Sequence, residues 1–419
     1  MSSLVDRVAP RRLGPDFRWL LGSSWASNLG DGLSVAAGPL LVASLTSDAR
    51  LVALAAAVQW VPGAVLALYA GALADRYDRR SIIIWGNVAR VLVLSALTAL
   101  VASGRATIEL ILLVLFVVAV IETFVDAASR TVLPMIVPKS DLAIAGARFT
   151  FGWVGLNQLL GAPFGAALFV IGPAWPFAAQ TVLMALGALL LARIRLPGVV
   201  RGPRRHVVHE IGAGLRWAWT HRAMRALILQ IFLFNLTYGA SWGVLVLYAA
   251  QRLGLDEVGF GAMATATALG SLLGTVTYGW LSRRFSIADI MRYGLVVETL
   301  THLGLALTTS PAVAMGILAI FGIHIAYWAT TASAVRQRAI PMELQGRVGA
   351  AYVMAMLGGM ALGSVIGGVL AQRWGILAPY WFGFLGSALL TAVLWRELGH
   401  VAHEDARILA AEDDPVDPA

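Results

Sequence analysis

The sequence predicts an all-α integral membrane protein whose twelve transmembrane helices form two pseudo-symmetric six-helix bundles. Hydrophobic residues make up 59% of the 419 positions and charged residues only 13%, and the mean hydropathy is +0.77. Soluble domains are closer to half apolar and one quarter charged. Apolar runs long enough to cross a hydrocarbon core of ~30 Å recur along the chain, and landmarks of its first half return in the second.

The apolar runs set the expected spans, because a helix that crosses lipid satisfies its own backbone hydrogen bonds. The spans are expected at residues 18–46, 52–74, 82–103, 107–129, 143–170, 177–195, 226–250, 258–281, 287–308, 312–335, 348–370 and 378–395. The connections are mostly short, so neighbouring spans should be antiparallel. The first run is too long for the apolar region of a signal peptide, so it is predicted to be a retained helix.

The basic residues predict the topology. Of the 31 lysines and arginines, only Arg50, Arg105, Arg252 and Arg373 fall in loops on the side opposite the termini. Cytoplasmic loops are enriched in these residues, so both termini are predicted to be cytoplasmic. The net charge of +8 is therefore a topology signal, and no nucleic-acid partner is expected. The chain has no cysteine, which excludes disulfides, palmitoylation and thiolate metal sites.

Four landmarks repeat in the same order in the two halves. Asn28 returns as Asn235 at an offset of 207, and Gly71 as Gly279 at 208. VLPM at 132–135 returns as AIPM at 339–342, and GAPFGA at 161–166 as GSVIGG at 363–368. The expected organisation is an N-terminal tail at 1–17, a first bundle at 18–196, a central cytoplasmic loop at 197–225, a second bundle at 226–395 and an acidic tail at 396–419. Transporters use such repeats to place a substrate site midway across the membrane.

The central loop is basic, and its residues 208–225 have apolar positions at helical spacing. This pattern predicts an amphipathic helix at the anionic inner leaflet, and a simple tether between the halves is the open alternative. The acidic tail is predicted to be disordered.

A charged cluster, GALADRYDRRS at 71–81, separates the second and third spans. Its motif residues are Gly71, Leu73, Asp75, Arg76, Asp78, Arg79 and Arg80. Gly71 allows a close approach between helices, and the arginines oppose translocation of the loop. The copy in the second half keeps Gly279 and Arg284 but has Ser286 where Asp78 would fall.

With this motif, two six-helix halves and a long central loop, the sequence resembles the major facilitator superfamily. The resemblance implies a conformational latch in which Asp75 bridges to an arginine at the cytoplasmic end of span 4, here Arg130; a role only in setting topology stays open. The LGDGL of span 1, ETFVDAASRTVLPMIVP and GAPFGA resemble bacterial exporters of enterobactin-type siderophores, macrolides or tetracyclines. A monomer in the bacterial inner membrane, with a small-molecule substrate and no cofactor, is implied.

Ionisable residues inside spans are functional candidates, because lipid makes them costly. Asp31 lies roughly 20 Å into span 1 at 1.5 Å per residue, near mid-membrane. Glu122 and Asp126 share one face of span 4, and Glu298 lies near the middle of span 9. Their functional interpretation is proton coupling or cation binding. Arg90 in span 3 is the expected ion-pair partner, and a fixed structural pair is the alternative.

Two further interpretations concern the same spans. Asp126 could simply cap span 4 near Arg130. Glu298 stands 208 positions after Arg90, so a pair that switches between the halves is also a hypothesis. His302 and His324 are interpreted as packing residues, and no residues have metal-ligand spacing.

Depth in the spans and the family resemblance suggest the lining of a central substrate cavity. The candidates are Asn28, Gln59, Trp25, Trp153 and Asn235. Aromatic faces can hold a lipophilic cation beside an acid. GAPFGA also resembles the antiporter motif G-P-x-x-G-G of exporters, and small residues allow close helix packing. The predicted helix-packing glycines are Gly161, Gly165, Gly363 and Gly367.

Enzyme motifs are out of context. GASWG at 239–243 matches a nucleophile elbow but falls inside a span, and Lys139, the sole lysine, is not part of a Walker A motif. The sequence therefore predicts a non-enzymatic secondary transporter, a proton-coupled exporter of amphipathic small molecules that works by alternating access. The alternatives are an exporter of one native metabolite such as a siderophore, an importer with the same fold, and a non-transporting sensor or scaffold.

Overall fold

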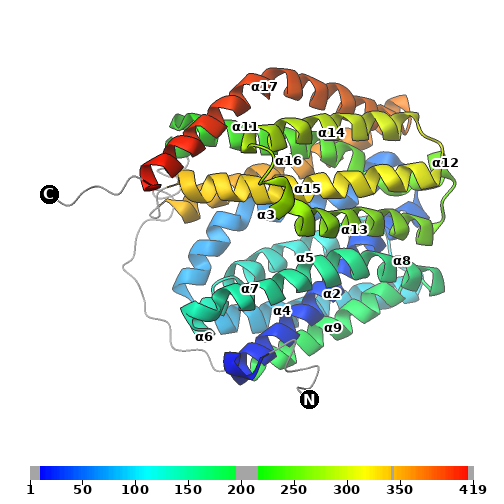
Figure 1. Cartoon of the computed structure of the whole chain (residues 1–419). Helices are drawn as coiled ribbons and strands as arrows, with labels where there is room; N and C mark the ends of the chain where they lie inside the picture. The colour runs from blue at the N-terminus through cyan, green and yellow to red at the C-terminus, as the bar shows by residue number, and fades with distance from the viewer. Residues whose placement is uncertain (1–9, 195–215, 341–343, 414–419) are drawn as a thin grey trace, which may run out of the picture. The chain divides into compact units, whose positions relative to one another are not determined.

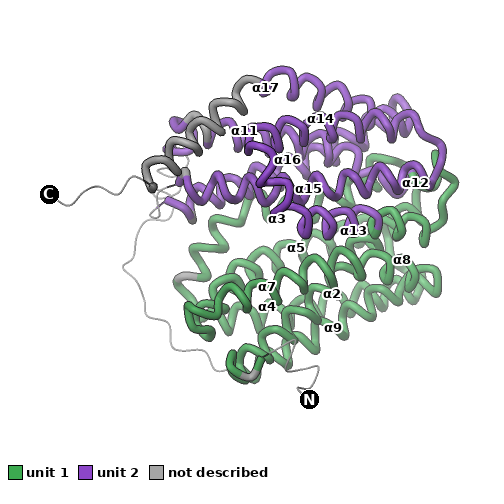
Figure 2. Tube along the Cα trace, viewed as in Figure 1, with its two compact units in different colours: residues 1–204, 249–265 green, residues 205–248, 266–419 purple. Residues whose placement is uncertain are grey.

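The computed structural model describes residues 10–194, 216–340 and 344–413, with the backbone alone for 396–413. Every regular element in these ranges is a helix and none is a strand, which confirms the predicted all-α class. The chain divides into two compact units, coloured separately in Figure 2. The first unit comprises Met1–Arg204 and Ala249–Thr265, and the second Arg205–Tyr248 and Ala266–Ala419.

The first unit is built from long helices joined by short turns (Figure 1). In chain order its elements are η1 (Arg11–Leu13), α2 (Gly14–Leu45), α3 (Ala49–Arg76), α4 (Arg79–Ala102), α5 (Ile108–Ser129), α6 (Leu133–Ile136), η2 (Lys139–Asp141), α7 (Leu142–Phe151), the π-helix η3 (Gly152–Gly161), α8 (Ala162–Ile171) and α9 (Trp175–Ala192). Helix α2 packs against α9 and against η3 and α8, whereas α4 packs against α5 and α9. Helix α4 thus faces both α5 and α9 in the interior of this unit.

The second unit repeats this design. Its elements are α11 (Arg222–Trp242), α12 (Leu245–Leu253), α13 (Glu257–Leu281), α14 (Ile287–Leu307), α15 (Pro311–Ala339), α16 (Gln345–Trp374) and α17 (Ala378–Asp413). Helix α11 packs against α16 and α17, and α14 packs against α15 and α17. The end of α12 and the first turns of α13 belong to the first unit by their contacts, although the sequence assigns them to the second bundle.

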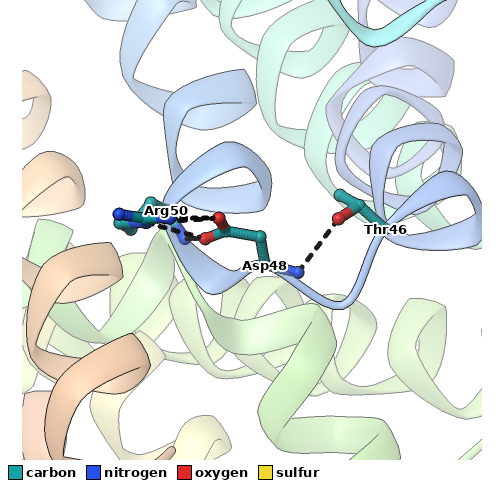
Figure 3. A network of polar contacts seen from close by, with 3 residues as sticks. All are labelled: Thr46, Asp48 and Arg50. Carbon is teal, nitrogen blue, oxygen red and sulfur yellow. Dashed lines mark hydrogen bonds and ion pairs between the residues drawn. The ribbon is translucent and has the colours of Figure 1, made fainter.

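Short polar side chains cap helices where the apolar pattern breaks, and Figure 3 shows the turn between α2 and α3. The Asp48 carboxylate accepts from the backbone N–H of Arg50 at 2.9 Å and from its Nη2 at 2.6 Å. Thr46 Oγ1 accepts from the backbone N–H of Asp48 at 3.1 Å. The hydrogen bond from the Arg50 side chain is the main reason that the pKa of Asp48 is lowered. In this turn Asp48 thus forms an ion pair with Arg50, one of the four cations expected outside the cytoplasm.

The number of possible membrane spans depends on two properties of each helix, its length and its apolarity. Among the described residues, nine helical segments meet both criteria, and the pair α11–α12, bent by 47°, makes a tenth if it is counted as one span. Helices α2 and α14 fall outside this set. Both carry acidic and other polar residues within their length, such as Asp31 and Glu298. The predicted count of twelve stays a prediction.

Span 5 is a continuous helical stretch whose hydrogen bonding changes from α-helical to π-helical and back again. The ten-residue π-helix η3 lies between α7 and α8. Pro163, in the first turn of α8, has no N–H to donate to the carbonyl four residues earlier, which favours a wider turn there. The π-helix packs directly on α2, the helix that carries Asp31.

Two predictions about the loop and the tail have different outcomes. The first part of the amphipathic helix expected at 208–225, residues 208–215, lies outside the described residues; of the described part, 216–220 are helical and α11 begins at Arg222. The tail, expected to be disordered, continues α17 as a helix to Asp413. Its Ala, Leu, Glu and Arg residues are strong helix formers, and this local propensity outweighs the acidic composition.

Candidate functional site

Three helices of the first unit bring three charged side chains into one ionic cluster, formed by Asp31 of α2, Arg90 of α4 and Glu122 of α5. The Nη2 group of Arg90 donates to Asp31 Oδ1 and lies 3.8 Å from Glu122 Oε2. Arg90 is only 2% exposed, whereas the Glu122 side chain is 37% exposed. The arginine is buried because it lies on the inward stripe of α4, with Ile83, Asn87, Leu94 and Leu97.

A side chain that sequence analysis missed completes this cluster. Gln180 of α9 donates from Nε2 to Asp31 Oδ1 at 3.4 Å, and Ser34 donates to Gln180 Oε1. Gln180 is the only amide side chain in α9. A lone polar residue in an apolar span was the available signal. Four helices, α2, α4, α5 and α9, therefore hold the cluster.

The cluster contains more acids than bases. Arg90 is one cation between two carboxylates. Asp126 follows one turn after Glu122 on α5, is exposed, and lies within electrostatic range of Arg130 and Arg90. Counted among themselves, these three acids and two arginines carry one net negative charge when all are ionised. Chemically, the arrangement can hold one proton or one cationic group of a ligand.

Most predicted cavity residues make bonds local to their own helices. Asn28 Nδ2 donates to Ser24 O and Asn235 Nδ2 to Ile231 O, each at 2.8 Å, and Gln59 Nε2 donates to Ala55 O at 2.8 Å. The two asparagines thus make the same bond at equivalent positions of the repeat.

The two predicted cavity tryptophans lie in different environments. The indole N–H of Trp25 donates to Arg148 O at 3.0 Å, and its ring centroid lies 5.3 Å from that of Phe151. Trp153, on η3, is 55% exposed. A role for any of the five residues in holding substrate stays a prediction.

The charged motif between α3 and α4 makes several contacts within the first unit. Arg80 Nη2 donates to the carbonyl of Ala192, the last residue of α9, at 2.6 Å. Arg79 donates from Nε to Ala74 O at 3.2 Å. These bonds join the ends of three helices. The side chain of Asp75 lies outside the described residues, so the latch with Arg130 stays a prediction.

The close helix approach expected at Gly71 is not formed within the first unit. Apart from the backbone of its own helix, no atom of the described residues lies within 4 Å of the place that a Cβ would take at Gly71. The neighbouring positions Ala70 and Ala74 are packed, each 1% exposed.

The motif and its second-half copy share a capping role. Asp78 caps α4 by accepting from the backbone N–H of Ser81 at 2.9 Å. Ser286, at the equivalent position, caps α14 by accepting from the backbone N–H of Asp289 at 3.2 Å. The residue type has changed, but both helices begin with a side-chain cap.

Replacing Asp78 with alanine is expected to lower the free energy of unfolding by about 0.5–2 kcal/mol at neutral pH, since α4 loses its cap. The hydrogen bond from the Ser81 side chain lowers the pKa of Asp78, so the ionised form is the stabilising one. Its contribution is complete above the pKa of the unfolded chain and is lost as pH falls through the lower folded-state pKa. Thermal unfolding in detergent at neutral and acidic pH measures both effects. Asp78→Asn, which still caps, is the control, and an alanine variant as stable as wild type at neutral pH would contradict the role.

The predicted packing glycines bring helix backbones into contact in both units. A Cβ at Gly161 would overlap Gly32, and one at Gly165 would overlap the carbonyl oxygen of Leu33, both in α2. In the second unit, Gly363 and Gly367 of α16 meet α11 in the same way. The repeat is thus kept as a pair of glycine-lined helix contacts, α2 with η3–α8 and α11 with α16.

The GAPFGA segment has a second neighbour within the first unit. A Cβ at Gly261, in the first turns of α13, would stand 2.9 Å from Ala166 Cβ and 3.1 Å from Pro163 Cα. These turns therefore pack closely on α8. This contact explains why residues 249–265 group with the first unit.

Glu298 and Arg90 have separate partners within their own units, and the pair that would switch between the halves stays a prediction. Arg90 binds Asp31 in the first unit, whereas Glu298 Oε1 accepts from Thr237 Oγ1 at 2.9 Å in the second. The equivalence of their positions in the repeat is kept, since each side chain reaches the first helix of its own unit.

Comparison with known proteins gives a consistent set of relatives. The family model described as "Transmembrane secretion effector" matches residues 7–414. Macrolide efflux protein A of Streptococcus pyogenes is 22% identical, over 82% of this chain and 86% of that protein. Multidrug efflux pump Tap of Mycolicibacterium fortuitum is 26% identical, over 86% of this chain and 90% of that protein. The inward-facing crystal structure of a bacterial homologue of the iron transporter ferroportin has a TM-score of 0.73 at 17% identity and covers 91% of this chain and 98% of its own, a likeness of fold alone.

Proposed function

The chain belongs to the transmembrane secretion effector family, a branch of the major facilitator superfamily, and from this membership we propose that it is a proton-coupled exporter of amphipathic small molecules. It is a multi-pass membrane transporter and not an enzyme. The observation that supports coupling most directly is the cluster of Asp31, Arg90 and Glu122, in which one buried cation serves two carboxylates.

The mechanism follows from the charge balance of this cluster. Arg90 is bound closely by Asp31, so Glu122, which is farther from the guanidinium and more exposed, is the group that needs a further positive charge. A proton or the cationic group of a substrate can supply it. The two cannot do so together, because the site would then exceed neutrality. Competition for one negative charge is the basis of antiport, in which substrate entry releases a proton and proton entry releases substrate.

Asp31, Gln180 and Ser34 have a different role from Glu122. The amide of Gln180 donates to the same oxygen of Asp31 that binds Arg90, and Ser34 in turn donates to Gln180. This chain of hydrogen bonds holds Asp31 against Arg90 and orients the guanidinium toward Glu122. We assign these three residues to positioning, and Glu122 to proton exchange.

The direction and substrate class rest on the relatives. Those named above are a macrolide efflux protein and a multidrug efflux pump, which supports export of drug-like molecules by this chain. The distribution of lysine and arginine supports a topology with both termini in the cytoplasm of a bacterial inner membrane. We propose a monomer as the transporting unit.

Glu122→Gln is expected to abolish transport driven by a pH gradient. The measurement uses the full-length protein in liposomes, with an imposed pH gradient and ethidium as the probe. The control is Glu109→Gln, which removes an acid from the exposed first turn of the same helix and should transport as wild type does. Asp31→Asn is expected to lose coupling as well, because it releases Arg90.

The outcomes separate the alternatives. If wild-type transport ignores the gradient, or if Glu122→Gln keeps the wild-type response, proton coupling at this cluster is wrong. Accumulation in the opposite direction would identify an importer. A wild type that moves ethidium under no condition would favour a narrow native substrate, such as a siderophore, or a sensor.

A further inference from the structure

The second unit contains a buried polar strip that the mechanism above does not use. It is formed by Glu298 and His302, one turn apart on α14, and by Thr237 and Ser241, one turn apart on α11. Thr237 Oγ1 donates to Glu298 Oε1 at 2.9 Å, and Ser241 Oγ lies 3.1 Å from His302 Nδ1. All four are buried, and Glu298 is 0% exposed.

Two atoms of this strip are left without a hydrogen-bond partner among the described residues, Oε2 of Glu298 and Nε2 of His302. Buried polar atoms in folded proteins are almost always paired. A carboxyl group that serves only packing would be expected to bond through both oxygens. The free oxygen of Glu298 is therefore a position at which a proton can be held and later given up.

The helices around Glu298 bring no cation to it in the described part of the chain. From α11 it receives the Thr237 hydroxyl, the sole polar partner of its carboxyl group among the described residues. The titratable residues inside the spans of the surrounding helices are Tyr238, His324, Tyr327 and Tyr380, together with Tyr293 and His302 on α14 itself. The charged residues of α14, Asp289 and Arg292, lie near its start and pair with each other at 3.9 Å.

The imidazoles of His302, within the strip, and of His324, on α15, are enclosed by packing. Gly383 of α17 faces the ring of His302, since a Cβ there would stand 2.8 Å from His302 Cγ. His324 of α15 lies among aromatic rings, with centroids 5.9 Å from Phe234 and from Phe321. Neither ring forms an ion pair with Glu298 among the described residues.

We propose that Glu298 is a second proton-binding site, separate from the cluster in the first unit. A buried carboxylate with no cation is far less stable than its neutral form, so the packed state of this unit holds the proton on Glu298. The comparison with the first unit supports this. At the equivalent position, Arg90 carries a positive charge and lies beside acids. Glu298 has no cation beside it among the described residues, so its carboxylate can be neutralised only by a proton taken up from solution.

The consequence for transport rests on the proposed function. One proton exchanges at Glu122 and one at Glu298, so two protons move for each substrate. Binding of the proton itself does not depend on transport, and the two claims can therefore fail separately.

The direct test is infrared difference spectroscopy of the full-length protein in lipid across a pH titration, which detects the C=O stretch of protonated carboxyl groups. Glu298→Gln is expected to remove one such group per protein. The matched control, Asp289→Asn, removes an exposed acid from the same helix and should leave that band unchanged. Thr237→Val should shift the frequency of the band without removing it, because the carbonyl loses its hydrogen-bond donor.

A second measurement gives the stoichiometry. With the membrane potential clamped at zero and a tenfold proton gradient, wild-type liposomes should accumulate ethidium about 100-fold and Glu298→Gln about 10-fold. An unchanged carboxyl band in a folded Glu298→Gln protein would overturn the proposal, and so would a band that disappears when sodium is added at constant pH. If the band is lost as expected but wild type moves no ethidium, the proton site stands and the exporter proposal fails.

Discussion

Replacing Arg90 with leucine is expected to destabilise the protein by about 3–5 kcal/mol, because breaking a buried ion pair from one side leaves an uncompensated charge. Arg90 is almost fully buried and binds Asp31 while standing close to Glu122. Without the guanidinium, the carboxylates of Asp31 and Glu122 are left close together with no cation between them. The expected measurement is a large drop in the midpoint of thermal unfolding in detergent.

Two companion variants make this experiment specific. Arg105→Leu removes an arginine from the exposed turn between α4 and α5 and should change the free energy of unfolding by no more than about 0.5 kcal/mol. The double variant Asp31→Leu with Arg90→Leu should recover much of the lost stability, since it removes both closely paired charges. It should still lack gradient-driven transport. If Arg90→Leu unfolds at the wild-type temperature, the cluster does not contribute to stability as a buried pair.

The second large effect is expected at Gly367 of α16. A Cβ there would overlap the Ala240 carbonyl oxygen and stand 2.7 Å from Ala240 Cα. Both are backbone atoms, which cannot move aside as a flexible side chain can. Gly367→Ala should therefore destabilise the second unit by about 1–3 kcal/mol, toward the upper end of the cost of overpacking.

The same helix provides the control for this substitution. At Gly349, also in α16, no atom of the described residues lies within 4 Å of the position that a Cβ would take, so Gly349→Ala meets open space. It should stabilise the helix by roughly 0.5–1 kcal/mol, because alanine loses less conformational freedom on folding than glycine does. Thermal unfolding of the two variants side by side gives the answer. Equal shifts for both would show that the α11–α16 contact is not tight.

Sequence reasoning found the fold and part of the cluster because lipid makes certain signals rare. An acid or an arginine inside an apolar span is conspicuous, so Asp31, Arg90 and Glu122 could be named from the sequence alone. Which of these charged side chains come into contact depends on which helices pack against each other, and the sequence does not show this. Gln180 went unnoticed because a single amide costs less in lipid than a charge and belongs to no motif.

Contacts between helices are the part that the sequence shows least. Glu298 and Arg90 hold equivalent positions in the repeat, and each binds the first long helix of its own unit. The pair that would switch between the halves stays a prediction. Gly71 is similar: the sequence shows a residue that permits close packing, but not whether a helix is there to use it. The helical tail shows local propensity prevailing over net charge.

The glycine-lined contacts have a mechanical consequence. Where backbone rests on backbone, as α2 does on η3–α8 and α11 does on α16, there is no compressible layer of side chains between the two helices. We expect each such pair of helices to move as one rigid unit, because sliding or bending along the contact would bring backbone atoms into collision. We therefore expect bending of the chain to be concentrated elsewhere, at the bend between α11 and α12 and in the short turns that join neighbouring helices. The glycines therefore decide where the protein can bend as well as how closely it packs.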